Sequence, residues 1–167
     1  MKLHFEPNLD YQRTAIESVC DLFRGQEICR SEFTVTHSDP DAQQTLTFAH
    51  SDLGIGNRLQ LLDDELHTNL NDIQLRNGLK PSGALTSGDF TVEMETGTGK
   101  TYVYLRTIFE LHKDYGFTKF VIVVPSVAIK EGVYKTLQIT EDHFRIHNAN
   151  TPFEFFLYDT DKLGQVR

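Results

Sequence analysis

The sequence predicts an α/β domain in which a parallel sheet is flanked by helices and a segment forming a hairpin and a helix is inserted. Residues 90–158 alternate short apolar runs with stretches of helical spacing, and a Gly/Thr-rich turn joins the first run to the first helix. Such alternation is typical of parallel strands joined by crossover helices. The 167 residues, 39% of them hydrophobic, suit a single globular unit.

The first predicted helix runs from Arg13 to Arg24. Its apolar residues recur at helical spacing, and Gly25 is placed to end it. These apolar residues are Ile16, Val19, Cys20 and Phe23.

Residues 26–85 differ in character and are interpreted as an insertion. They are rich in Asp, Asn, Gln, Ser and Thr, and two alternating runs, 33–37 and 45–49, flank Asp39-Pro40-Asp41, which predicts a hairpin. Residues 57–74 then predict a helix with an apolar stripe. The stripe consists of Leu59, Leu62, Leu66, Leu70 and Ile73. These apolar side chains need an apolar surface to pack against. We favour the sheet of this chain over a partner protein as that surface.

The α/β unit follows from residue 89. Three apolar runs, 90–94, 120–124 and 153–158, predict strands, the second of them stopped by Pro125. Helices are predicted between them at about 99–115 and 127–137.

Composition excludes several classes of protein. No apolar run reaches the ~20 residues that a membrane helix needs, and the N-terminal residues lack the apolar core of a signal peptide. The two cysteines, Cys20 and Cys29, are not spaced like zinc ligands or like the cysteines of a disulfide-rich domain, so both are expected to be incidental thiols. Residues 1–85 carry 7 basic and 13 acidic residues, and 86–167 carry 9 and 11. This acidic chain should bind nucleic acid poorly by itself.

The residues most informative about function are Glu95 to Thr101, between a predicted strand and a predicted helix. Gly97 and Gly99 let backbone N–H groups surround a polyphosphate at the positive end of a helix dipole. Lys100 is placed to reach the β- and γ-phosphates, and Thr101 to offer its hydroxyl to Mg²⁺. The strict pattern has glycine where this chain has Met94, and a plain strand-to-helix turn is the alternative. We expect six residues to bind ATP: Thr96, Gly97, Thr98, Gly99, Lys100 and Thr101, with Lys100 and Thr101 acting in catalysis.

Two further segments resemble those of superfamily 2 helicases and translocases. Residues 9–12, before the first helix, resemble the segment whose glutamine reads adenine, which assigns that role to Gln12. Alone, Gln12 would be a solvent-facing residue at a helix start. Pro125 and Ser126, after the second apolar run, resemble the turn that touches DNA phosphates, although Ser126 also suits a plain helix N-cap.

Together, residues 5–12, 94–104 and 123–133 resemble the start of the restriction (Res) subunit of type III restriction-modification enzymes, and 155–167 also fit that family. The resemblance implies that 1–167 is the N-terminal part of the first of two RecA-like ATPase domains, with a phosphate loop. It further implies a cytoplasmic, ATP-dependent translocase and site-specific endonuclease on double-stranded DNA, with a methyltransferase (Mod) subunit as partner.

Most of that machinery is absent from these 167 residues. There is no Asp-Glu pair on a later strand, no second domain to supply an arginine and no nuclease carboxylate cluster. Asp63-Asp64-Glu65 precedes the phosphate loop, in the wrong order for this fold, and reads as a solvated helix face. The alternatives are therefore a truncated, non-catalytic protein that binds a nucleotide or a partner, or part of another superfamily 2 DNA helicase. A metabolic kinase is disfavoured because ~90 residues precede the loop.

Overall fold

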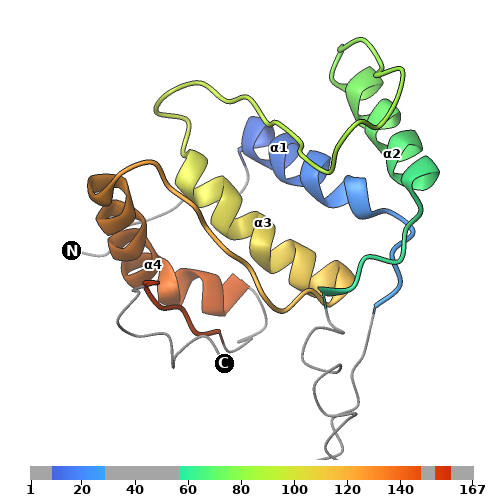
Figure 1. The fold of residues 1–167 in the computed structure, drawn as a ribbon. Coiled ribbons are helices and arrows are strands. Elements are labelled where there is room, and N and C mark those ends of the chain that lie inside the picture. The colour runs from blue at the N-terminus through green and yellow to red at the C-terminus, as the bar shows by residue number, and fades with distance from the viewer. Residues whose placement is uncertain (1–8, 29–56, 148–152, 159–167) are drawn as a thin grey trace, which may run out of the picture. The chain divides into compact units, whose positions relative to one another are not determined.

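The computed structural model describes residues 9–28, 57–147 and 153–158, which form helices joined by extended segments (Figure 1). The chain divides into two compact units. The first spans Pro7–Val121, and the second contains Ile122–Arg167.

Helix α1 spans Asp10–Cys20 and continues as a 3₁₀ turn, η1, over Asp21–Phe23. Asp10 places a carboxylate at the positive end of the helix dipole, and Gly25, with φ of +96°, lets the chain turn away after η1. The helix predicted from Arg13 is thus confirmed, with its start three residues earlier. As a result, Gln12 lies inside the first turn of α1.

Helix α3, Lys100–Tyr115, lies beside α1 and begins and ends at a glycine with positive φ (Figure 1). The two helices enclose the core of the first unit. Its buried residues are Ala15, Ile16, Cys20, Val103, Leu111 and Phe117. Phe23, Tyr115 and Phe117 extend this core with ring contacts of 5.2–6.1 Å between centroids. The Tyr115 hydroxyl donates a 2.9 Å hydrogen bond to the Cys20 carbonyl, which ties the end of α3 to the end of α1.

Helix α2, Asp63–Arg76, begins six residues after the predicted start. The Glu65 carboxylate accepts the Leu62 N–H at 2.8 Å and fixes that start. The apolar stripe is split: Leu66 and Ile73 are 5% and 9% exposed, whereas Leu59 and Leu62 are 45% and 69% exposed. Helix α2 packs on η1 within the same unit, and not on a sheet.

The parallel sheet predicted from the sequence is wrong, because none of the described residues forms a strand. Runs 90–94, 120–124 and 153–158 have no regular secondary structure and no ladder partner in the described part of the chain. Val121 and Val123 are 89% and 87% exposed. A β-branched run favours extended backbone, but a sheet also needs a second segment to exchange N–H···O bonds with it.

A side chain takes the place of such a partner just before the second run. Asn57 Oδ1 accepts the N–H groups of Thr118 and Lys119 at 2.8 and 3.1 Å, and Asn57 Nδ2 donates to the Lys119 carbonyl at 2.6 Å. An asparagine amide therefore satisfies the backbone groups that directly precede residues 120–124.

In the second unit, helix α4 spans Val127–His147, ten residues beyond the predicted end. Val133, Thr140 and Phe144 are 8%, 0% and 1% exposed, so the helical period of buried residues continues past Leu137. Phe155 contacts Tyr134 of this helix, with ring centroids 5.6 Å apart.

The hairpin predicted over 33–49 lies outside the described residues. The chain on either side of it is held together by Gln26, whose Oε1 accepts the Gln60 N–H at 2.9 Å and whose Nε2 donates to the Arg58 carbonyl at 3.2 Å. No helix in the described part of the chain is long and apolar enough to span a membrane.

Candidate functional site

The Gly-rich loop, Glu95–Gly99, leads directly into α3 and contains two glycines in the left-handed region. Gly97 has φ of +83° and Gly99 has φ of +84°. A Cβ at Gly97 would meet open space, whereas a Cβ at Gly99 would lie 2.7 Å from Gln12 Nε2. Gly99 is therefore required both by its backbone conformation and by the close approach of Gln12.

The loop is closed by hydrogen bonds to one backbone carbonyl. Thr98 Oγ1 donates to the Glu95 carbonyl at 2.7 Å, and Lys100 Nζ donates to the same oxygen at 2.5 Å. The ammonium group thus lies back over the loop, next to the first turn of α3. The N–H groups of that turn have no partner within the helix and carry the positive end of its dipole. The loop therefore gathers hydrogen-bond donors and positive charge.

Gln12 connects α1 to this loop. Its Nε2 donates a 2.8 Å hydrogen bond to the carbonyl of Thr98, 86 residues away in sequence. Gln12 is only 6% exposed, and its Oε1 is buried with no hydrogen-bond partner among the described residues. The interpretation of Gln12 as a solvent-facing residue is therefore wrong. A buried, unpaired amide oxygen beside the loop is an acceptor available to a ligand.

A groove of about 1400 Å³ reaches this loop. It is lined by one side of α1, by α2 and by residues between Leu79 and Thr98. Val19, Phe23, Ile73 and Phe90 give it an apolar part, and Thr96 to Thr98 lie at its border. The predicted loop residues Thr96, Gly97 and Thr98 therefore line this groove, whereas Gln12, Gly99, Lys100 and Thr101 are not among the residues that line it.

Pro125 and Ser126 lie at the start of α4, in the second unit, and both are exposed. Ser126 Oγ accepts the Ile129 N–H at 3.3 Å, and the Ser126 carbonyl accepts the Lys130 N–H at 3.0 Å. Ser126 is thus an N-cap. Its predicted contact with DNA phosphates stays a prediction.

The other titratable candidates lie apart from the Gly-rich loop in sequence. Asp63, Asp64 and Glu65 are exposed in the first turn of α2, as the sequence suggests. No group of three His, Cys, Asp or Glu residues in the described ranges is arranged to hold a metal ion. Burial, reinforced by the nearby carboxylates of Asp114 and Glu110, raises the pKa of the Cys20 thiol to about 12, so this cysteine is not a nucleophile.

The sequence does not reveal one part of the loop and one buried polar group on α3. The first is the Glu95 carbonyl, a backbone atom that no residue pattern reveals. The second is Tyr104, one turn after Thr101 on α3, whose hydroxyl is buried and has no hydrogen-bond partner among the described residues. The spacing of three residues between Thr101 and Tyr104, which places both on one face of a helix, was the signal in the sequence that could have identified Tyr104.

The segment predicted to bind phosphates thus contains two glycines with positive φ, and α3 begins at Lys100, whose ammonium group bonds back to the Glu95 carbonyl. Residues 7–152 match the family model described as "Type III restriction enzyme, res subunit". The chain belongs to this family, and the resemblance noted in the sequence is confirmed.

Individual relatives agree. The chain is 32% identical over 146 residues to the Res subunit of the type III restriction-modification enzyme EcoPI of Escherichia phage P1, covering 84% of this chain and 14% of the relative. It is 32% identical over 145 residues to the EcoP15I Res subunit of Escherichia coli, covering 84% and 13%. The StyLTI Res subunit of Salmonella typhimurium is 54% identical over 65 residues, covering 38% and 7%. The chain thus spans about one seventh of the curated relatives that it matches over most of its own length.

Proposed function

We propose that this chain is the ATP-binding N-terminal part of a type III restriction endonuclease and DNA translocase. The hydrogen bond between Gln12 and Thr98 carries this proposal, because it joins the two segments assigned to adenine and phosphates across 86 residues of sequence. In this proposal, residues 1–167 form the first part of an ATPase domain, and 26–85 are an insertion in it.

The residues present fit an adenine nucleotide. The buried Gln12 Oε1 accepts a hydrogen from the 6-amino group, which satisfies its unpaired oxygen. Nε2 has two hydrogens, so it keeps its bond to the Thr98 carbonyl while donating the other hydrogen to the base. The polyphosphate takes the N–H groups at the start of α3 and the Lys100 ammonium group, with Thr96 to Gly99 around it. Guanine presents an acceptor at its six-position and is disfavoured.

Mg²⁺ fits through Thr101. This ion binds through one or two protein oxygens together with the phosphates of the substrate, so it does not need a protein cage of carboxylates. When bound, it neutralises charge that develops on the phosphates. Lys100 neutralises charge on the same groups from the protein side.

DNA movement and cleavage belong to the whole protein in this proposal. The relatives are named as subunits of restriction-modification enzymes, which supports double-stranded DNA and a methyltransferase (Mod) subunit as partners. Pro125 and Ser126 contribute a phosphate contact from the start of α4. The second candidate function concerns the chain by itself, which would bind a nucleotide without catalysing its hydrolysis. Lys100 and Thr101 supply charge neutralisation, but attack on the γ-phosphate also requires an oriented water.

Titration of a fluorescent ATP analogue into the wild-type chain and into Lys100→Ala tests the proposal. We expect Lys100→Ala to weaken binding by at least ~10-fold, since a charge-assisted phosphate contact is lost. Lys113→Ala is the matched control, because Lys113 is an exposed lysine at the far end of the same helix. Equal affinity of the wild type and Lys100→Ala would contradict the assignment. Competition by GTP as effective as by ATP would remove Gln12 from the site.

A further inference from the structure

The Tyr104 hydroxyl is a buried polar group that the site described so far does not use. Its oxygen has no hydrogen-bond partner among the described residues. A buried hydroxyl without a partner destabilises a protein, and phenylalanine would fill the same space without that cost. Tyr104 therefore suggests a hydrogen bond that forms in another state of the site.

The position of Tyr104 on α3 indicates which group that is. Thr101 and Tyr104 are three residues apart on the same helix, so they share a face, and helical side chains incline toward the N-terminus. The two side chains therefore lie on the same face of α3, and the phenol oxygen has no hydrogen-bond partner among the described residues.

A threonine that ligates a metal ion uses a lone pair of its oxygen, so its proton must be directed elsewhere. An acceptor beside the hydroxyl fixes that orientation, in the way that outer groups orient the ligands of metal sites generally. The phenol oxygen is such an acceptor. We propose that Tyr104 is a positioning residue of the phosphate loop, which accepts the Thr101 proton and so directs the Thr101 oxygen toward Mg²⁺. This inference rests on the proposed function.

The test is the Mg²⁺ dependence of ATP affinity in Tyr104→Phe. Affinity is measured by calorimetry on the 167-residue chain, once with excess Mg²⁺ and once with EDTA. We expect Tyr104→Phe to weaken binding by ~10-fold in Mg²⁺ and to leave it unchanged in EDTA. Tyr102→Phe is the matched control, a tyrosine on the same helix at a different angular position, and it should change neither value. Thermal unfolding without ligand should be unchanged or slightly higher for Tyr104→Phe, because an unpaired buried hydroxyl is removed.

Two further variants identify the partner. Thr101→Ser keeps the hydroxyl and should keep the Mg²⁺ effect, whereas Thr101→Val should lose it, and adding Tyr104→Phe to Thr101→Val should then have no further effect. An equal loss of ATP affinity in Mg²⁺ and in EDTA would mean that Tyr104 has only a packing role. An ATP affinity in Mg²⁺ that is unchanged in Tyr104→Phe would also overturn the inference. Both outcomes would leave the proposed function intact. A wild-type chain that binds no ATP under either condition would overturn both.

Discussion

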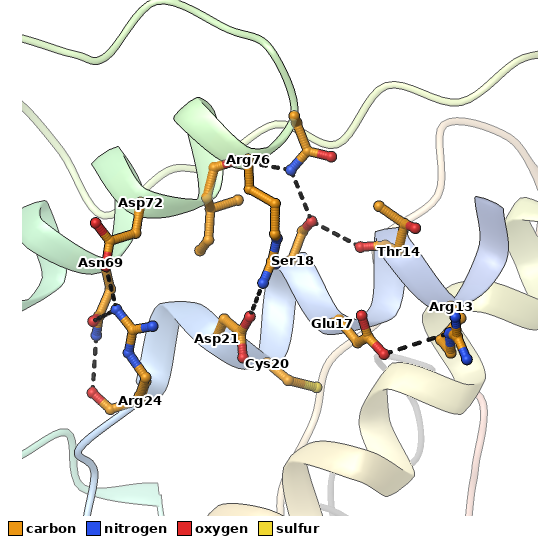
Figure 2. Close-up of polar contacts among 12 residues, drawn as sticks. Arg13, Thr14, Glu17, Ser18, Cys20, Asp21, Arg24, Asn69, Asp72 and Arg76 are labelled. Carbon is orange, nitrogen blue, oxygen red and sulfur yellow. Dashed lines mark hydrogen bonds and ion pairs between the residues drawn. The ribbon is translucent and has the colours of Figure 1, made fainter. Parts of the chain in front are cut away.

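Helix α1 and the η1 turn that continues it contact two other helices through two different kinds of chemistry. Toward α3 it presents Ala15, Ile16 and Cys20, which are buried in an apolar cluster. Toward α2, α1 and η1 present polar groups. Arg24 pairs with Asp72 at 2.6 Å, Asp21 pairs with Arg76 at 2.6 Å, and Ser18 contacts Asn77 at 3.3 Å (Figure 2).

The two interfaces differ in what each contact contributes. A buried apolar side chain contributes ~1.5–3 kcal/mol to folding, whereas an exposed ion pair contributes about 0–1 kcal/mol. The exception on the α2 side is Asn69, which is 6% exposed and donates to the carbonyls of Leu22 and Arg24 at 3.0 and 2.9 Å. The apolar interface therefore fixes α1, and with it Gln12, against the loop. Helix α2 also buries Leu66 and Ile73, so its side of the unit combines exposed ion pairs with the buried amide of Asn69 and some apolar burial.

The largest effect is expected from the apolar side. Ile16→Ala removes a side chain that is 5% exposed and should lower the free energy of unfolding by ~2–5 kcal/mol. Urea unfolding followed by circular dichroism measures this. Glu17→Ala, the exposed neighbour, should change stability by less than ~0.5 kcal/mol. Similar values for the two variants would contradict the assignment of the core to this face.

Asn69→Ala should cost ~2–3 kcal/mol, because two carbonyl groups at the end of η1 lose their donor. Asn69→Asp is the informative second variant. It keeps the oxygen that accepts from Arg24 at 3.1 Å but cannot donate to either carbonyl. We expect it to be destabilised too, in the same urea assay. If Asn69→Asp were as stable as wild type, the contact with Arg24 would be the important one.

Helices were predictable from the sequence because their apolar period and their glycine ends are local signals. Gly99 and Gly116 stand at the two ends of α3, as the pattern suggests, and Gly25 follows η1. The end of α4 was placed ten residues early, because Thr140, fully buried, does not read as a core residue in a hydrophobic pattern. Burial of a threonine depends on tertiary packing, which the period alone does not contain.

The sheet was not predictable for a different physical reason. Runs such as 120–124 have high β propensity, but pairing depends on a partner elsewhere in the chain, which a local pattern does not contain. The geometry of the turn was predictable where a motif is contiguous: Gly97 and Gly99 have positive φ, and α3 begins at Lys100. The contact of Gln12 with Thr98 carries no sequence signal of its own, since it depends on how α1 packs on α3.

The two interfaces should also respond to different solution conditions, the apolar one to alkaline pH. Burial raises the pKa of Cys20 from 9.0 to about 12 and that of Tyr115 from 10.0 to about 12. Both groups are neutral in the folded state, so their contribution is complete below pH 9 and is lost as the pH rises toward 12. We expect stability to fall by about 1–2 kcal/mol between pH 8 and 10.5. Urea midpoints at the two pH values measure the fall, which Cys20→Ala should reduce and Asp72→Asn should not.

The smallest effect is expected from the ion pairs of the α2 interface, and it should depend on salt. The side chains of Arg76 and Asp21 are 46% and 32% exposed, so water screens their 2.6 Å contact. A double-mutant cycle of Arg76→Gln and Asp21→Asn should give a coupling energy of about 0.5 kcal/mol at low salt. At 1 M NaCl the Debye length falls to about 3 Å and the coupling should approach zero. The loss of stability in Ile16→Ala should not weaken with salt, because burial of apolar surface involves no screened charge.

A coupling above ~1.5 kcal/mol that persists at 1 M NaCl would mean that the pair is shielded from solvent. Charge would then hold α2 on α1 as firmly as apolar packing holds α3, and the contrast between the two interfaces would not stand.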